Sequence, residues 1–249
     1  MSYISGFLTP VEDGKKDEYI ASAREAWPLF REYGATRQLE GWGDDVPEGK
    51  QTDFRRAVDL KDGETVVFSW IEWPDKATAD KCYAAMESDE RFQNLPMPFD
   101  GKRMVWGGFA PIFDEGAGPP PGAKDEPKRR IMYVNGFILA VPEDNKAAYK
   151  EVAEKFWDIV KDFGATAQVE CWEADVQDGH TTDFRRAVQC KDGEKIVFSW
   201  VTWPDKATSD ASHEKMMADP RMEEMGTEMP FDGKRMVFGG FEPLVWKEA

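Results

Sequence analysis

Residues 52–58 read Thr-Asp-Phe-Arg-Arg-Ala-Val, and residues 182–188 repeat that heptapeptide without a change. The same spacing of 130 residues relates Phe-Ser-Trp at residues 68–70 to the identical tripeptide at residues 198–200. Self-similarity at a fixed period is the sequence signature of a duplicated structural unit. The chain is therefore expected to contain two copies of one domain.

The two copies are separated by a segment with the composition of a linker. Residues 116–122 read Gly-Ala-Gly-Pro-Pro-Pro-Gly, and charged residues follow them. Stretches rich in proline and glycine connect domains rather than form helices or strands. We therefore expect a first α+β repeat over residues 1–115, a linker over residues 116–130 and a second repeat over residues 131–249.

Hydrophobic periodicity predicts the order of elements within each copy. In the first copy it predicts strands over residues 3–11, 36–42, 54–60, 66–73 and 102–113, and helices over residues 14–33 and 74–91. This is one strand more than a βαββαβ unit holds. Either a loop over residues 43–52 interrupts a single long strand, or the unit has an extra strand, and we favour the interruption.

The strand expected over residues 66–73 is apolar on both of its faces. The two alternating sets are Val66, Phe68 and Trp70, and Val67, Ile71 and Trp73. One face should meet the helices, and the other must also be covered, for which the equivalent sheet of the second copy is available. The sequence thus predicts an α+β fold in which two tandem ferredoxin-like βαββαβ domains pack sheet to sheet as an intramolecular dimeric α+β barrel. We expect this internal pseudo-dimer to be monomeric as a chain.

The net charge of −16 is shared evenly between the two copies. An acidic balance argues against nucleic acids and anionic membranes as partners, because proteins bind both through basic faces. None of the three cysteines has a counterpart at the repeat spacing, which is typical of free thiols in a reducing compartment. Since the sequence also shows no basic leader and no long apolar run, we expect a cytoplasmic protein.

Side chains that bind metals do not recur between the copies. His180 and His213 stand opposite Lys50 and Tyr83 at the repeat spacing. A haem or metal site present in both halves would need repeated clusters of His, Cys or carboxylate side chains. We therefore expect no metal and no cofactor, and the pattern assigns no catalytic residue.

A repeated polar set on the expected sheet is the best candidate for a site. If the heptapeptide lies in a strand, alternation places Arg56 and its counterpart Arg186 on the inner face. A buried arginine must be paired, because an unmatched charge in the interior costs several kcal/mol. Glu40 and Glu170 are the first candidates for that partner, and Asp100 is another. An internal bridge is favoured over an anion-binding site.

Four motifs resemble those of a known family. They are the segments 41–47, 52–58, 68–70 and 97–104, the last of which recurs, after two inserted residues, at 229–236. Together they resemble the YbaA-like family of bacterial domains of unknown function, domain of unknown function 1428. That family is similar to the dimeric α+β barrel superfamily, whose other branches include cofactor-free monooxygenases, haem-degrading enzymes and small stress-responsive proteins. The second copy departs from the pattern with Glu173-Ala174 in place of Gly43-Asp44.

The resemblance and the polar set together imply a small-molecule-binding or stress-related module. We expect its pocket between the sheet and the helices, because a few polar groups on an apolar wall are typical of ligand sites. The expected lining residues are Glu40, Trp42, Arg56 and Trp70, with their counterparts Glu170, Trp172, Arg186 and Trp200. A cofactor-independent monooxygenase-type enzyme is the first alternative, and a structural scaffold whose barrel is filled by side chains is the second.

Overall fold

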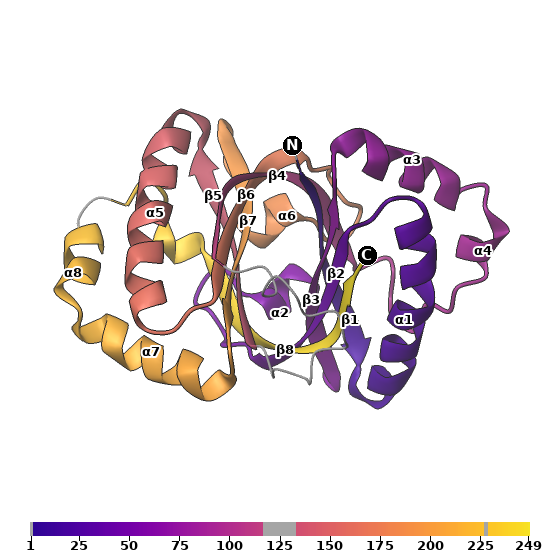
Figure 1. Ribbon diagram of the computed structural model, residues 1–249, viewed down its shortest axis with the longest axis horizontal. Helices are drawn as coiled ribbons and strands as arrows, with labels where there is room; N and C mark the ends of the chain where they lie inside the picture. Colours follow the sequence, from indigo (N-terminus) through magenta and orange to yellow (C-terminus); the bar gives the residue numbers. More distant parts are fainter. Residues whose placement is uncertain (1, 117–132, 227–228) are drawn as a thin grey trace.

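The computed structural model describes residues 2–116, 133–226 and 229–249, and its two halves carry matching elements (Figure 1). The first half contains β1 (Tyr3–Glu12), the 3₁₀ turn η1 (Asp13–Lys15), α1 (Lys16–Glu32), β2 (Arg37–Asp45), α2 (Phe54–Ala57), β3 (Glu64–Trp73), α3 (Lys76–Met86), α4 (Glu90–Gln93) and β4 (Val105–Gly116). The second contains β5 (Tyr133–Pro142), η2 (Glu143–Asn145), α5 (Lys146–Asp162), β6 (Ala167–Asp175), α6 (Phe184–Ala187), β7 (Glu194–Trp203), α7 (Lys206–Ala218), α8 (Pro220–Gly226), η3 (Gly233–Arg235) and β8 (Val237–Glu248). Apart from Gly116, which ends β4, the expected linker lies outside the described residues.

The strands close one antiparallel barrel in the order β1-β3-β2-β8-β5-β7-β6-β4. The two halves join edge to edge, because β2 pairs with β8 and β4 pairs with β6. Closure of this kind removes the exposed sheet edges that an isolated half would present. The α+β fold and the tandem repeat are confirmed, and the closed barrel is consistent with a dimeric α+β barrel formed by one chain.

Six of the described helices cover the outside of the barrel in two groups. Figure 1 shows α1, α3 and α4 on one side and α5, α7 and α8 on the other, while α2 and α6 lie within the outline of the barrel. The helix α1 ends at Glu32, and the expected stop signal, Gly34, follows with a φ of 102°, which is accessible mainly to glycine. No helix among the described residues is long and apolar enough to cross a membrane.

Stacked aromatic rings fill the interior of the barrel. The ring centroids of Phe68 and Phe198 lie 4.6 Å apart, and those of Trp70 and Trp200 lie 4.1 Å apart. These residues occupy matching positions of β3 and β7, so the approximate twofold axis of the duplication passes between them. The alternation expected for β3 is confirmed, because Phe68 and Trp70 belong to the barrel core while Trp73 packs under the helices of its own half.

The segment 54–60 is not a strand, and this prediction is wrong. Asp53 is extended and its carboxylate accepts a hydrogen bond from the Arg56 backbone N–H, so it caps the single helical turn of α2. A helical turn places residues i, i+3 and i+4 on one side. Phe54 and Val58 therefore point into the core, whereas Arg56 points outward. The correction also removes the surplus strand without any interruption of β2.

Other boundaries differ by a few residues. The helix expected over residues 74–91 is two helices, α3 and α4, because Asp89 caps a new turn by accepting from the Arg91 backbone N–H. The last strand of the first half begins at Val105 rather than at Lys102. The intervening loop is held by Arg103, whose side chain bonds to Asp100 and Glu64.

Candidate functional site

The residues expected to line one pocket lie in four separate places. Trp70 and Trp200 are stacked inside the barrel. Glu40 and Trp42, with their counterparts Glu170 and Trp172, lie buried between the barrel and the helices α1 and α5. Arg56 and Arg186 lie at the surface, with side chains 47% and 55% exposed. Within each half the structure thus buries the glutamate and the neighbouring tryptophan in the same layer. The arginines lie apart from both.

Glu40 is paired with a tyrosine rather than with an arginine. Its carboxylate accepts from the Tyr19 hydroxyl at 2.6 Å and from Gln38 Nε2 at 2.8 Å. The expected bridge between Arg56 and Glu40 is therefore wrong. The physical reason is that β2 turns Glu40 toward α1, while the helical turn of α2 carries Arg56 outward to the surface.

The second half repeats this buried cluster. Glu170 accepts from the Tyr149 hydroxyl at 2.6 Å and from Gln168 Nε2 at 2.9 Å. Burial raises the pKa of Glu170 from its ordinary value of 4.5 to about 7, although hydrogen bonds from Tyr149, Ser199 and Gln168 oppose the shift. Burial likewise raises the pKa of Glu40. Each of the two carboxyl groups can therefore stay protonated at a higher pH than an exposed glutamate does.

The buried arginines are Arg103 and Arg235, which the sequence reasoning missed. Arg103 Nη1 and Nη2 donate to the two oxygens of Glu64 at 2.7 Å each, and its Nε donates to Asp100 at 2.9 Å. Arg103 Nη1 also donates to the Asp59 carbonyl at 2.8 Å, which fixes the chain directly after α2. The available signal was the Asp-Gly-Lys-Arg segment, which recurs unchanged and places an acid three residues before each arginine.

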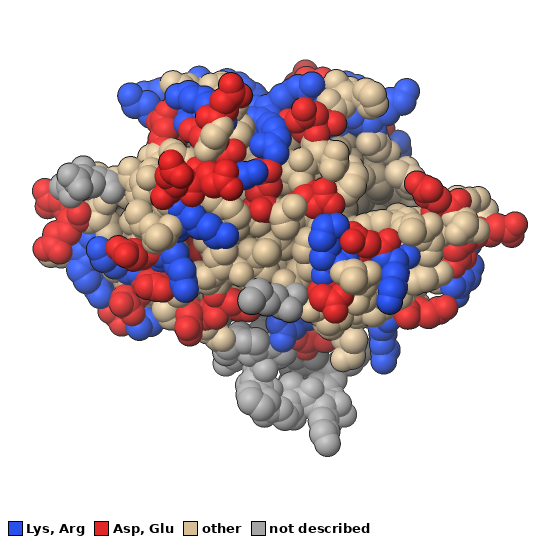
Figure 2. Space-filling view, turned by 90° about the horizontal axis from the view of Figure 1, so that it is seen from above, with Lys and Arg blue, Asp and Glu red and all other residues tan. Residues whose placement is uncertain are grey.

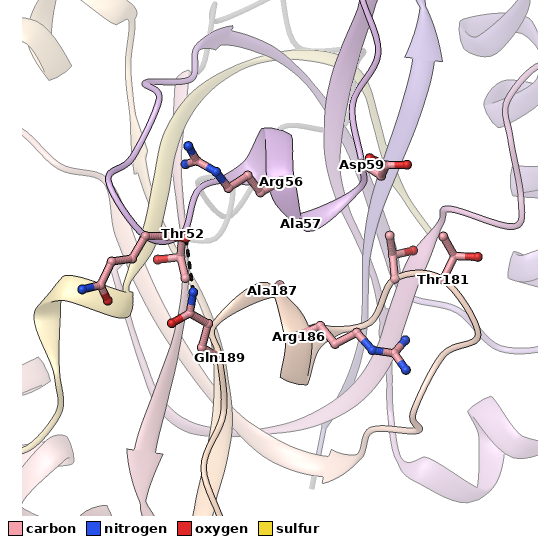
Figure 3. Close-up of a pocket in the computed structure, with 10 residues that line it drawn as sticks. Thr52, Arg56, Ala57, Asp59, Thr181, Arg186, Ala187 and Gln189 are labelled. Carbon is pink, nitrogen blue, oxygen red and sulfur yellow. Dashed lines mark hydrogen bonds between the residues drawn. The ribbon is translucent and has the colours of Figure 1, made fainter.

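A groove of about 420 Å³ lies between α2 and α6, where the two halves meet (Figure 3). We call it the junction groove. Its lining residues form pairs at the repeat spacing: Gln51 and Thr181, Thr52 and Thr182, Arg56 and Arg186, Ala57 and Ala187, and Asp59 and Gln189. Figure 3 shows Ala57 and Ala187 near its centre, with the Arg56 and Arg186 guanidinium groups directed to opposite sides.

Both groove arginines are anchored through Nη1, and Arg56 Nη2 also lies 3.4 Å from the exposed carboxylate of Glu48. Arg186 Nη1 donates to the Gly179 carbonyl at 2.7 Å and lies 3.0 Å from an oxygen of Asp183. Arg56 Nη1 makes the equivalent contacts with Gly49 and Asp53. Within the described parts of the chain, nothing accepts from Nε or Nη2 of Arg186. Each guanidinium is therefore held in place while its other edge faces outward.

The two threonines of the groove differ in their hydrogen bonding. The Thr182 hydroxyl donates to the Arg103 carbonyl at 2.8 Å. The Thr52 hydroxyl is buried and has no hydrogen-bond partner among the described residues. A buried hydroxyl without a partner costs about 1–3 kcal/mol, so this group favours an incoming polar atom.

A second groove, of about 510 Å³, lies in the first half beside Phe99 and Lys61. Its deepest charged groups are Arg103, Glu64 and Asp100, which already satisfy one another. Across the described ranges, no group of three or more His, Cys, Asp and Glu side chains is placed to hold a metal ion. On the face shown in Figure 2, acidic and basic side chains are interspersed. The junction groove therefore offers the larger number of uncommitted polar groups.

Sequence comparison gives a family for both halves. The family described as "Protein of unknown function (DUF1428)" matches residues 2–101 and 132–233. The uncharacterized protein YbaA of Escherichia coli K12 is 55% identical over 115 residues, which are 46% of this chain and 98% of that protein. One half of the chain thus corresponds to the whole of that relative.

Solved structures show the same fold at low sequence identity. A candidate monooxygenase from Lactobacillus acidophilus NCFM superposes with a TM-score of 0.60 at 9% identity, covering 99% of this chain and 96% of that one. A candidate monooxygenase from Fusobacterium nucleatum gives 0.57 at 10% identity, covering 99% and 94%. An anthrone oxidase-like protein gives 0.56 at 12% identity, covering 100% and 93%. These likenesses support the fold of the chain.

Proposed function

The chain belongs to DUF1428, a family of unknown function, and from its own geometry we propose that it binds one small carboxylate in the junction groove. The observation that carries this proposal is the pair of anchored guanidinium groups, Arg56 and Arg186, that line one groove. A planar guanidinium with a free edge can bind a carboxylate through two parallel hydrogen bonds.

Anchoring also makes binding less costly. A side chain that is already held by an aspartate and a carbonyl loses little further freedom when a ligand arrives. Arg186 is held in this way by Asp183 and Gly179. The volume of about 420 Å³ is in the range of small-molecule sites. A ligand of a few carbon atoms with a carboxylate is the class that fits.

The groove exists only where the two halves meet. We propose that the fused repeats act as a ferredoxin-like pseudo-dimer and that the chain works as a monomer with one groove. A single-domain relative would have to pair two copies to form the equivalent surface. Free Cys82, Cys171 and Cys190 fit a protein that works in the reducing cytoplasm.

Isothermal titration calorimetry with acetate, glutarate and benzoate tests the proposal. At least one of these carboxylates should bind, and Arg56→Ala should weaken it by about tenfold, which corresponds to one lost charge-assisted contact. Arg55→Ala is the matched control, because Arg55 precedes Arg56 on the same helical turn but does not line the groove. Equal effects of the Arg55 and Arg56 substitutions would contradict a site in the groove.

A cofactor-independent enzyme of the monooxygenase type is the second candidate. The observation that favours it is the buried pair of Glu170 and Tyr149, because a carboxyl with a pKa of about 7 suits a general base. Oxygen uptake with anthrone that is lost in Glu170→Gln would support this candidate. Unchanged uptake in that variant, or none in the wild type, would speak against it.

A structural scaffold without a ligand is the third candidate. The filled barrel supports it only in so far as the interior has no room for a ligand. The stacked rings of Phe68, Phe198, Trp70 and Trp200 occupy the space that an internal ligand would need. Binding at the surface groove is compatible with such a core. The calorimetric titration separates the two readings, because a pure scaffold would bind none of the carboxylates.

A further inference from the structure

The junction groove differs between its two ends. Figure 3 shows Arg56, Thr52 and Gln189 on one side of the groove, and Arg186 and Asp59 on the other. Asp59 and Gln189 occupy the same position of the repeat. One end therefore carries a carboxylate where the other carries a neutral amide, and a ligand that spans the groove meets two different environments.

The end at Thr52 presents hydrogen-bond donors. The Thr52 hydroxyl is buried without a partner among the described residues, and Arg56 Nε and Nη2 face outward from their anchor. Gln189 Nε2 lies 3.4 Å from the Gln51 carbonyl of the other half and closes this end. A ligand carboxylate can accept from both the hydroxyl and the guanidinium.

One acidic side chain competes at that end. Glu48 lies 3.4 Å from Arg56 Nη2, and its side chain is 76% exposed. A contact this long with so exposed a group contributes little, because solvent screens it. Asp53, in contrast, is buried and already accepts from the Arg56 side chain and from two backbone N–H groups. A ligand carboxylate therefore needs to displace only Glu48.

The end at Asp59 presents an uncommitted acceptor. The Asp59 backbone has a φ of 48°, a left-handed conformation that aspartate adopts more readily than most residues. Arg103 Nη1 holds its carbonyl at 2.8 Å, so the residue is fixed in place. No described residue donates to or pairs with the Asp59 carboxylate. At the same end the Thr182 hydroxyl is already used by the Arg103 carbonyl.

We propose that the ligand is a small zwitterion with a carboxylate at one end and an ammonium group at the other, as in an ω-amino acid. Its carboxylate binds Thr52 and Arg56, and its ammonium group binds Asp59. Electrostatic complementarity selects this orientation, because Asp59 offsets the charge of Arg186 at one end of the groove, whereas the neutral Gln189 leaves the charge of Arg56 to attract the carboxylate at the other. This inference rests on the proposed carboxylate site and adds its polarity.

Calorimetry with three probes of equal chain length tests the polarity. 5-Aminovalerate carries both charges, glutarate carries two carboxylates and valerate carries one. The wild type should bind 5-aminovalerate about fivefold more tightly than valerate, the upper end of what an exposed ion pair contributes. Glutarate should bind more weakly than 5-aminovalerate.

Substitutions at the two ends supply the controls. Asp59→Asn should abolish the preference for 5-aminovalerate over valerate and leave valerate binding unchanged. Thr52→Val should weaken all three probes. Gln189→Glu places a carboxylate at the other end and should also weaken all three. Circular dichroism confirms that each variant is folded before it is titrated.

The outcomes separate the two proposals. Tighter binding of glutarate than of 5-aminovalerate, with both lost in Arg56→Ala, overturns the polarity and leaves the carboxylate site standing. An unchanged preference in Asp59→Asn also overturns it. Failure of all three probes to bind the wild type at millimolar concentration refutes the carboxylate site itself, and the zwitterion proposal with it.

Discussion

Replacing Arg103 with alanine should destabilise the chain far more than replacing Arg56. The Arg103 side chain is 6% exposed and makes two 2.7 Å bonds to Glu64 and one of 2.9 Å to Asp100. Its removal leaves the Glu64 side chain, 9% exposed, without its cation. Breaking a buried pair from one side costs about 3–5 kcal/mol. Arg56 is 47% exposed, so its loss should cost about 0–1 kcal/mol.

Urea denaturation followed by tryptophan fluorescence measures both free energies of unfolding. The guanidinium of Arg103 holds the pKa of Glu64 below its ordinary value. A lowered folded-state pKa contributes stability above the unfolded-state pKa, and this contribution disappears as the pH falls through the folded-state value. The difference between wild type and Arg103→Ala should therefore narrow in acid. An Arg103→Ala variant that is as stable as Arg56→Ala would refute the reasoning.

Three further predictions concern the buried cluster at Glu170 and the aromatic interior of the barrel. Folding raises the pKa of Glu170 to about 7, so the folded state is stabilised while Glu170 is protonated, and this stabilisation declines by roughly 3 kcal/mol between about pH 4.5 and pH 7. The free energy of unfolding of Glu170→Gln should therefore rise relative to that of the wild type between pH 5 and pH 8. Parallel pH profiles of the two proteins would contradict this. Trp70→Ala should cost about 3–5 kcal/mol by opening a cavity in the filled barrel, and a cost under about 1 kcal/mol would show a looser interior. Gly6→Ala should lower the free energy of unfolding by about 1–3 kcal/mol, because the added Cβ would lie 2.9 Å from the Phe198 ring. Gly14→Ala is the control, because a Cβ at Gly14 meets nothing within 4 Å. Equal thermal midpoints for the two variants would contradict the close approach of Gly6 to Phe198.

Much of the fold was predictable because the repeat constrains it twice. An apolar strand with two buried faces, such as residues 66–73, needs cover on both sides, and the second copy is the available cover. The prediction of a strand over residues 54–60 is wrong because Phe54 and Val58 fit both an alternating pattern and a helical one over so short a length. The decisive signal was local, since Asp53 is a favourable helix cap and Asp59 tolerates a left-handed backbone.

The candidate site was predictable only in part. The repeat singles out Arg56 and Arg186, but a strand pattern predicts that they are buried, whereas their helical turns place them at the surface. The junction groove could not be read from the sequence, because it forms between two helical turns that are 130 residues apart and meet across the approximate twofold axis. Pairing of Arg103 with Glu64 likewise depends on the tertiary fold, although its acid at Asp100 is local.

Alanine methyl groups allow the most direct test of the claim that ligand binds where the two halves meet. Ala57 and Ala187 line the junction groove, Ala140 lies inside the barrel and Ala153 lies on the buried face of α5 beside the buried carboxyl cluster. In protein labelled with ¹³C at the alanine methyl groups, titration with 5-aminovalerate, valerate or glutarate should shift the Ala57 and Ala187 resonances in a saturable manner and leave Ala140 and Ala153 unchanged. Shifts confined to Ala140 or Ala153 would contradict the account and place the site in the barrel or under the helix.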